Sequence, residues 1–239
     1  MSSDTRNSLL RQNRVLASLA DRTLDQLAPH LETVPLVPRN VLCEAGERLE
    51  FVHFPLAGVV CLMASLREGI AETAAVGAEG FIGLECALGG DRALSRALVQ
   101  LPGSAVRMPL EALRALAARH EDVRHVLLRY VRFFVIQALQ SVACNSLHSV
   151  DERCARWLLT AHDRSGLAQS FPLTQEFLAE MLGVHRPSVT IAARTLQRAG
   201  LIRYSRGIIV ITDREGLEEA ACECYGVIRR ALDEILPAH

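Results

Sequence analysis

The segment from Thr174 to Ile202 constrains the fold most, because its spacing is that of two short helices that meet at a glycine turn. Gly183 can take the positive φ that a tight turn between helices requires, and Ala179 lets the second helix approach the first closely. Gln175 stands at a helix start, and Val189 stands where a core anchor is needed. We therefore interpret the segment as a helix-turn-helix, a motif that places its second helix in the major groove of DNA.

The residues from Gly183 to Gly207 include no Asp or Glu, and they carry five arginines: Arg186, Arg194, Arg198, Arg203 and Arg206. Such a local excess of positive charge suits the phosphates of DNA. After the second helix, the β-branched run from Leu201 to Thr212 has Arg206-Gly207 at its centre, a pattern typical of a hairpin. This placement predicts the wing of a winged helix-turn-helix. From these residues alone, a plain helical hairpin with a solvated arginine face stays open as the alternative.

Position along the second helix predicts a role for each polar side chain. Arg186, Ser188 and Thr190 lie in its first turns, where side chains reach base edges, and Arg186 can pair with both acceptors of a guanine. Arg194 and Arg198 lie further along and are expected to meet phosphates. Arg203 and Arg206 on the wing either contact phosphates or keep the surface soluble. The predicted DNA-binding residues are Thr174, Gln175, Arg186, Pro187, Ser188, Thr190, Arg194, Arg198, Arg203 and Arg206.

The composition bounds the class of protein. The chain has 239 residues, of which 50% are hydrophobic, and this indicates a globular protein with room for two domains. A formal net charge of -1 means that DNA affinity has to come from a local basic patch. No uninterrupted apolar run reaches the roughly 18 residues of a membrane span, and seven irregularly spaced cysteines suit a reducing compartment. We expect a cytoplasmic protein.

The N-terminal half predicts an α+β organisation. Residues 13–31 show the apolar spacing of short amphipathic helices, and residues 34–108 consist of short β-branched runs punctuated by Gly and Pro. The second pattern is typical of an antiparallel β-sandwich or jelly roll. Three regions are therefore expected: a sandwich domain with N-terminal helices at 1–118, a dimerisation helix at 119–148 and a winged helix-turn-helix domain at 149–239.

The segment from Leu110 to about Val150 has no Pro or Gly and is predicted to be helical. Apolar and small residues within it alternate spacings of four and three, as the seam of a coiled coil does. We expect a parallel homodimer through this helix, while a monomeric core helix stays open as the alternative. The predicted seam comprises Val123, Leu127, Tyr130, Phe134, Gln137 and Ser141, and continues to Cys144.

A sandwich, a long helix and a C-terminal winged helix-turn-helix, in this order, resemble the Crp/Fnr family of bacterial transcription regulators. The resemblance is carried by residues 174–202, by 153–163 before them, and by Phe54-Pro-Leu-Ala-Gly-Val-Val60 and Gly80-Phe-Ile-Gly83 in the sandwich. It implies a homodimer that binds a palindromic DNA site and contacts or blocks RNA polymerase. It also implies that any effector sits between sandwich and long helix and acts on a hinge near residues 145–152. Pro187 and Ile191 depart from the base-reading residues usual in the family, so the target sequence should differ.

The resemblance also implies where a cyclic nucleotide would bind. Members that bind one hold its ribose with a glutamate directly after a glycine, and its phosphate with an arginine followed by Ser or Thr and then Ala. Here Leu84 follows Gly83, with Glu85 one place late, and no hydroxyl residue separates Arg96 from Ala97. The candidate effector pocket comprises Gly83, Leu84, Glu85, Arg92, Ser95 and Arg96. We expect a degenerate site with an unknown effector or none, and a cyclic-nucleotide-responsive regulator stays the alternative.

Other classes of function find less support in the residues. The resemblance implies that cluster-bearing relatives carry several cysteines near the N-terminus, whereas the first cysteine here is Cys43, so an iron-sulfur cluster is poorly supported. Cys222 and Cys224 on one helix would point their thiols to different faces and are a weak metal signal. A gas-sensing regulator would need a haem ligand, and the candidate ligands are His53, His120, His125 and His148. His53 is alone between Pro35 and Met108, which disfavours a metal-dependent jelly-roll enzyme. We therefore expect neither catalysis nor a bound cofactor or metal, and a protein-interaction module without DNA affinity is the remaining class.

Overall fold

A computed structural model describes residues 3–67, 69–165 and 170–237, so Met1 and Ser2 of the N-terminal segment lie outside the described residues. The N-terminal part begins with short helices: α1 (Ser3–Leu10), α2 (Arg14–Ala17), α3 (Asp21–Leu27) and the 3-10 turn η1 (Ala28–His30). Asn13 caps α2, and its side chain donates to the carbonyls of Pro55 (2.9 Å) and Gly80 (2.7 Å). This buried side chain fixes the short N-terminal helices to the sheet.

A five-stranded antiparallel sheet follows. Its elements are β1 (Glu32–Leu36), β2 (Val41–Cys43), β3 (Phe51–Leu66), β4 (Gly69–Val76), the 3-10 turn η2 (Leu84–Leu88) and β5 (Arg96–Pro109). The strand order is β1-β5-β3-β4, with β2 also paired to β5. The long strands β3 and β5 approach so closely near Gly103 that a Cβ atom there would lie 2.0 Å from the carbonyl oxygen of Ala57. The α+β class and the antiparallel sheet domain are as predicted.

The predicted uninterrupted helix from Leu110 to Val150 is wrong in one respect, because the structure has two helices there. They are α4 (Leu110–Arg119) and α5 (Glu121–Leu147), separated by His120 in an extended conformation. Glu121 and Asp122 lie in the first turn of α5, where acidic side chains interact favourably with the helix dipole. The acidic pair was the local signal for a new helix start.

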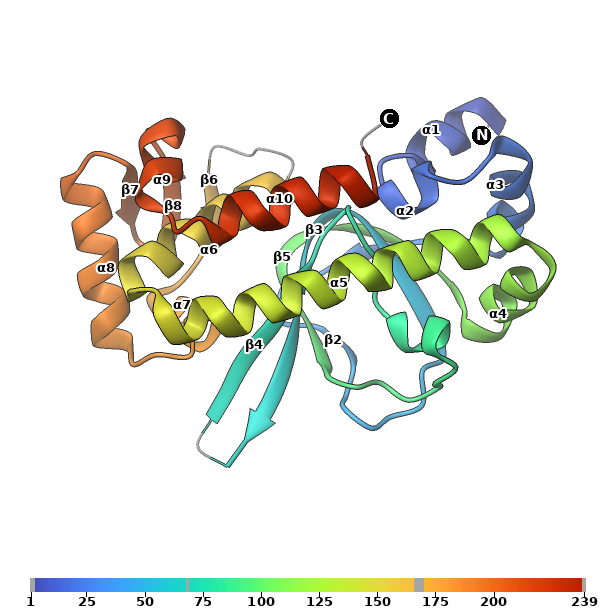
Figure 1. Ribbon diagram of the computed structural model, residues 1–239, viewed down its shortest axis with the longest axis horizontal. Helices are drawn as coiled ribbons and strands as arrows, with labels where there is room; N and C mark the ends of the chain where they lie inside the picture. Colours follow the sequence, from blue (N-terminus) through green and yellow to red (C-terminus); the bar gives the residue numbers. More distant parts are fainter. Residues whose placement is uncertain (1–2, 68, 166–169, 238–239) are drawn as a thin grey trace.

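The C-terminal part consists of α6 (Val150–Arg164), β6 (Ser170–Pro172), α7 (Gln175–Leu182), α8 (Arg186–Arg198), β7 (Ile202–Ser205), β8 (Ile208–Ile211), α9 (Arg214–Ala220) and α10 (Cys224–Ile235). A small sheet has the order β6-β8-β7. In Figure 1, α5 and α10 run side by side along the long axis, and α10 ends beside the N-terminal helices. Arg14 pairs with Asp233 at 2.7 Å there, and so links the two ends of the described chain.

Two hydrophobic cores hold these parts together. The larger core lies between the sheet, the N-terminal helices and α5. The second core contains Val59, Cys61 and Met63 of β3 together with Trp157 and Leu158 of α6 and the inner faces of α7 and α8. The C-terminal part therefore shares a core with the sheet domain.

The α5 helix is long and apolar enough, by length and composition, to cross a membrane. A core helix of a globular protein can have the same composition, and α5 packs on β4, η2, α4 and α10. Its apolar residues are accordingly divided between the interior and one exposed face.

Candidate nucleic-acid interface

The helix-turn-helix is built by local capping interactions. The Thr174 hydroxyl accepts from the backbone N–H of Phe177 (3.2 Å) and so begins α7, while Gly183 ends it with φ 61°. The second helix, α8, has Pro187 in its first turn, where a missing N–H costs no hydrogen bond. The turn, the small residue Ala179 and the buried anchor Val189 all lie as the spacing predicted.

The outer face of α8 is solvent-exposed and basic. Val189, Ala192 and Leu196 point into the shared core. Arg186, Pro187, Ile191, Arg194 and Arg198 are exposed on the opposite face. Figure 1 shows α8 at the end of the molecule remote from the N-terminal helices.

Two of the predicted contact residues are partly withdrawn from this face. Ser188 and Thr190 are half-buried, and the Thr190 hydroxyl donates to Oε1 of Gln175 at 2.8 Å. This bond fixes α8 against the start of α7 and holds the Thr190 side chain inside the motif. Positional reasoning placed Thr190 on the correct turn, but the bond to Gln175 depends on how the two helices cross.

The wing lies beside α8 and is a hairpin of β7 and β8 joined by a two-residue turn. Arg206 and Gly207 both have positive φ (51° and 76°), as a type I′ turn requires. The backbone N–H of Tyr204 donates to the Gln197 side chain at 2.8 Å, which couples the wing to α8. Arg203 and Arg206 are exposed. The predicted hairpin is confirmed, and it sets the wing arginines next to the arginine face of α8.

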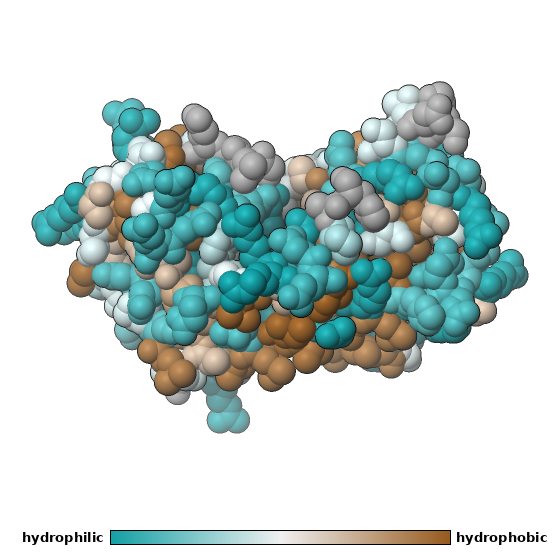
Figure 2. Space-filling view, turned by 45° about the horizontal axis from the view of Figure 1, so that its top comes forward, coloured by the Kyte–Doolittle hydropathy of each residue, from teal (hydrophilic) through white to brown (hydrophobic). Residues whose placement is uncertain are grey.

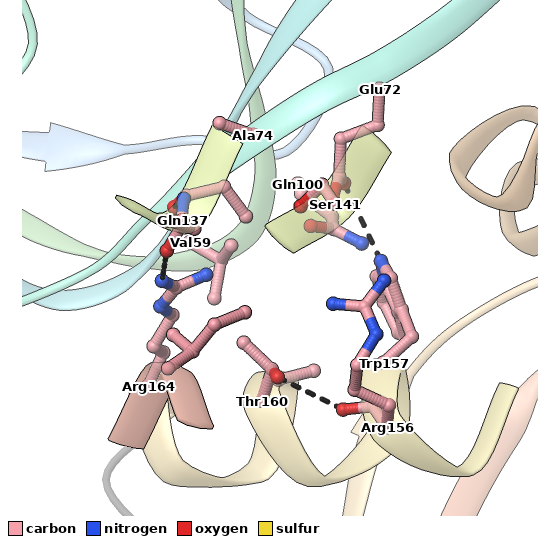
Figure 3. Close-up of a pocket in the computed structure, with 13 residues that line it drawn as sticks. Val59, Glu72, Ala74, Gln100, Gln137, Ser141, Arg156, Trp157, Thr160 and Arg164 are labelled. Carbon is pink, nitrogen blue, oxygen red and sulfur yellow. Dashed lines mark hydrogen bonds between the residues drawn. The ribbon is translucent and has the colours of Figure 1, made fainter. Parts of the chain in front are cut away.

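A buried polar interface joins this domain to the sheet. Figure 3 shows Trp157 and Arg164 of α6 pointing toward Glu72 and Gln137, around a cavity of about 30 Å3. Burial raises the pKa of the Glu72 carboxyl, although hydrogen bonds from Cys61 and Trp157 favour its charged form. This space is about that of one water molecule and is far below the roughly 300 Å3 of a ligand pocket.

A wider cleft of about 570 Å3 lies between α6, α9, α10 and the N-terminal helices. Its arginines have carboxylate partners: Arg14 pairs with Asp233 (2.7 Å), Arg214 with Asp163 (2.8 Å) and Arg164 with Glu79 (2.8 Å). Arg229 also lines the cleft and lies 3.8 Å from Glu218. None of the other three arginines is therefore left to select an anion.

Charged residues of the candidate effector pocket bond to neighbouring loops of the chain. Oε1 of Glu85 accepts from the backbone N–H of Leu94 (2.7 Å), and Nε of Arg96 lies 3.3 Å from Oε1 of Glu44. Arg92 is exposed and donates to the carbonyl of Gly46 (2.8 Å). Gly83 takes φ 100° at the start of η2, Leu84 is buried in that turn, and Ser95 is half-buried. Glu85, Arg92 and Arg96 thus join neighbouring loops of the sheet domain.

The predicted dimer seam on α5 needs correction. Val123, Leu127, Tyr130, Gln137 and Cys144 are buried inside this chain, and Phe134 and Ser141 are half-buried. Leu147, the last residue of α5, is exposed, and four further exposed apolar residues lie together on another face: Leu128, Val135, Leu139 and Val142. We call this set the α5 stripe. In Figure 2 hydrophobic side chains gather in a band along the long axis of the molecule, over α5.

Known proteins share the fold and the helix-turn-helix described above. Residues 152–220 match the family model of the Crp-like helix-turn-helix domain. No curated protein sequence matches the chain. Among solved structures, FixK2 from Bradyrhizobium japonicum is similar with a TM-score of 0.69 and 19% identity, covering 80% of this chain and 98% of FixK2.

Two further structures show the same likeness. TTHB099, a transcriptional regulator of the CRP family from Thermus thermophilus, has a TM-score of 0.66 and 22% identity over 79% of this chain and 96% of its own. CLP, the c-di-GMP responsive global regulator of Xanthomonas campestris, has a TM-score of 0.65 and 14% identity over 80% and 99%. At these identities the likeness establishes the fold. The chain thus has the fold of the Crp/Fnr regulators and carries a Crp-like helix-turn-helix domain at residues 152–220.

Proposed function

We propose that this protein is a sequence-specific DNA-binding transcription regulator and not an enzyme. The proposal rests on the exposed face of α8, which carries arginines in a segment, residues 183–207, that has no Asp or Glu. This face lies beside a wing with two more arginines, in a Crp-like helix-turn-helix domain. A surface of this kind binds the phosphates on both sides of a groove while one helix reads the bases within it.

Base reading is assigned to the start of α8. Arg186 is exposed in the first turn and can pair bidentately with guanine, which discriminates against other bases by about 1–3 kcal/mol. Ile191, with 63% of its surface exposed, is the next residue on this face and offers an apolar contact to a thymine methyl group. Arg194, Arg198, Arg203 and Arg206 contact phosphates, and Thr174 and Gln175 support the start of the motif.

A homodimer is proposed through the α5 stripe instead of the predicted seam. Leu128, Val135, Leu139 and Val142 are spaced by seven, four and three residues, as heptad positions d, d, a and d are, with the exposed Arg132 at the a position between the first two. Two copies related by a two-fold axis would present two recognition helices to successive major grooves, about 34–36 Å apart, of a palindromic site. Such a regulator acts in the cytoplasm and either contacts or blocks RNA polymerase.

We propose that cyclic nucleotide is not needed for DNA binding, and that any effector is of another kind. The support is that Glu85 and Arg96, the nearest equivalents of the ribose and phosphate contacts, bond within the chain. A phosphate bound without a paired arginine would lose the charge-assisted hydrogen bonds that hold it. A cyclic-nucleotide-responsive regulator remains the second candidate, and it requires the Arg96–Glu44 pair to open.

The test is selection of bound fragments from the organism's genomic DNA by purified protein at near-physiological salt, followed by affinity measurements on the enriched sequence. We expect one palindrome, with affinity that falls steeply as salt rises. Arg186→Ala should relax preference at one base pair per half-site, whereas Arg194→Ala should weaken binding to all sequences and reduce the salt slope by about one per protomer, or about two for the dimer. Arg119→Ala, at an exposed site on α4, is the matched control. Binding that ignores salt and sequence would reject the proposal, and enrichment only with added cyclic nucleotide would favour the second candidate.

A further inference from the structure

Four metal-binding side chains meet where α5 ends and α10 begins. Cys144 and His148 come from the end of α5, one helical turn apart, and Cys222 and Cys224 come from the turn before α10 and its first residue. Their ligand atoms, three Sγ and one imidazole nitrogen, all lie within 4.8 Å of one another. The three cysteines are buried and His148 is half-buried. We call this set the hinge cluster.

The hinge cluster corrects an expectation from the sequence. Cys222 and Cys224 do not point to opposite faces of one helix, because α10 begins at Cys224 and Cys222 lies in the preceding turn. The turn lets both thiols face the same point. Cys144 and His148 share a face because residues four apart on a helix are neighbours.

The spacing in the hinge cluster fits one tetrahedral ion. An ion about 2.3 Å from sulfur and about 2.0 Å from nitrogen sets tetrahedral ligands about 3.5–3.8 Å apart. Sγ of Cys144 lies 3.5 Å from Sγ of Cys222, and Sγ of Cys224 lies 3.5 Å from Nδ1 of His148. A four-iron cluster instead binds each thiolate to a different iron, which requires sulfurs further apart. Three sulfurs and one imidazole are a donor set typical of structural zinc.

The surroundings of the hinge cluster also suit a metal. While Nδ1 of His148 faces the thiols, its Nε2 lies 3.2 Å from the Glu223 carboxylate, the outer partner that orients a metal-binding histidine. Nε2 of Gln140 donates to Sγ of Cys224 at 3.1 Å. Three thiolates around a divalent ion carry one net negative charge, and the positive charges of Arg153 and Arg156 act on this cluster. A buried charge of this kind is therefore compensated.

We propose that Cys144, His148, Cys222 and Cys224 bind a single divalent, zinc-like ion that clamps the end of α5 to the start of α10. The clamp spans the junction between α5 and α6, since two ligands precede Ser149 and two follow the wing. It thereby fixes the orientation of the helix-turn-helix domain relative to α5. Metal binding itself does not depend on the proposed function. Only an effect of the metal on DNA affinity would depend on that function.

The experiment uses the full chain, purified anaerobically with reductant, stripped with a chelator and titrated with Co2+. We expect one Co2+ per chain, the intense visible absorption of tetrahedral coordination with a thiolate-to-cobalt charge-transfer band, and its loss on adding one equivalent of Zn2+. Cys224→Ser and His148→Ala should abolish this spectrum, while Cys43→Ser, which removes a half-buried thiol outside the hinge cluster, should keep it. Glu223→Gln should weaken Zn2+ affinity about 10–100-fold. Circular dichroism verifies that each variant is folded. If Cys224→Ser does not fold, the test depends on His148→Ala, which removes a partly exposed side chain.

The clamp is tested by hydrogen exchange of the amides at residues 145–152. Zn2+ should slow their exchange in the unmodified chain and leave it unchanged in His148→Ala. Octahedral Co2+, a spectrum insensitive to His148→Ala, or iron with acid-labile sulfide would each overturn the single-ion site. A Cys144–Cys222 disulfide that forms equally fast with and without Zn2+ would overturn it as well. Tight Zn2+ binding with no change in exchange would reject the clamp.

Discussion

Arg164 of α6 and Glu79, which follows β4, form an ion pair of 2.8 Å in which 8% and 6% of the side chains remain exposed. Arg164 also donates to Oε1 of Gln137 on α5 at 2.7 Å, and Glu79 accepts from the backbone N–H of Gly77 at 3.0 Å. One guanidinium thus joins the sheet domain, the long helix and the first helix of the DNA-binding domain. Because the pair is withdrawn from water, losing either partner leaves an uncompensated buried charge.

Replacing Arg164 with Met should therefore lower the free energy of unfolding by about 3–5 kcal/mol, measured by urea denaturation. Arg48→Met is the matched control, since Arg48 and its partner Asp91 are 69% and 44% exposed. Exposed pairs contribute no more than about 1 kcal/mol. Equal losses in the two variants would mean that burial of the Arg164–Glu79 pair is unimportant.

Gly80 should not tolerate even a methyl group. A Cβ atom at Gly80 would lie 2.2 Å from the ring of Tyr130, which packs on Phe81 with ring centroids 4.9 Å apart. Gly80→Ala should cost at least about 1–3 kcal/mol of stability, because the buried Tyr130 ring has to move. At Gly90 the nearest atom would lie 3.4 Å away, so Gly90→Ala should change the midpoint of unfolding little. A Gly80→Ala chain as stable as Gly90→Ala would contradict this packing.

The α5 stripe should determine the oligomeric state. Leu139 is 67% exposed at the middle of the stripe, so Leu139→Glu should place a charge inside the proposed interface and yield monomers in sedimentation experiments. Leu94→Glu changes a residue that is 73% exposed in the sheet domain and should leave the dimer intact. A Leu139→Glu chain that remains dimeric would move the interface to another surface.

His53 should make the fold sensitive to acid. Burial first, and the Arg107 charge second, lower its pKa to about 4. In the unfolded chain the imidazole titrates near 6.5, so between about pH 6.5 and 4 the unfolded state binds a proton that the folded state does not. Stability should fall by up to about 1.4 kcal/mol per pH unit as pH drops through this window, to about 3 kcal/mol in total.

This dependence is measured as the difference in unfolding free energy between the unmodified chain and His53→Gln at several pH values from 7 to 4.5. The difference should narrow as pH falls, because only the unmodified chain carries the buried imidazole. His30→Gln, which removes an exposed histidine, should leave the dependence unchanged. Parallel curves for the unmodified chain and His53→Gln would show that His53 charges without cost to the fold.

The elements with strong local signals were predictable from the sequence. Gly183 requires a positive φ, Thr174 caps a helix, and Arg206-Gly207 forms a two-residue turn, and each of these depends on neighbours close in the chain. Together they specify the helix-turn-helix and its wing. The break at His120 was missed because a single extended residue between two helices leaves the apolar periodicity almost unchanged.

The parts that depend on tertiary packing were not predictable. The α5 helix has apolar residues on two faces, and nothing in its periodicity says that Tyr130 meets the sheet while Leu139 meets solvent. The hinge cluster joins residues 78 positions apart, Cys144 and Cys222, through the return of α10 along α5. Its sequence signal was a Cys and a His four apart, followed much later by Cys-x-Cys, and it is recognisable only once this return is known.

The shared second core has a consequence for how such a protein can be taken apart. Val59, Cys61 and Met63 on the sheet are covered by α6, so a fragment that stops at residue 149 would present an apolar sheet face to water. Such faces promote association between chains. Grafting a foreign DNA-reading domain onto this sheet would succeed only if its first helix carried apolar residues at the positions of Trp157 and Leu158 and a cation opposite Glu79. A redesign of the helix-turn-helix domain is therefore expected to require matching substitutions in the sheet domain, and the reverse.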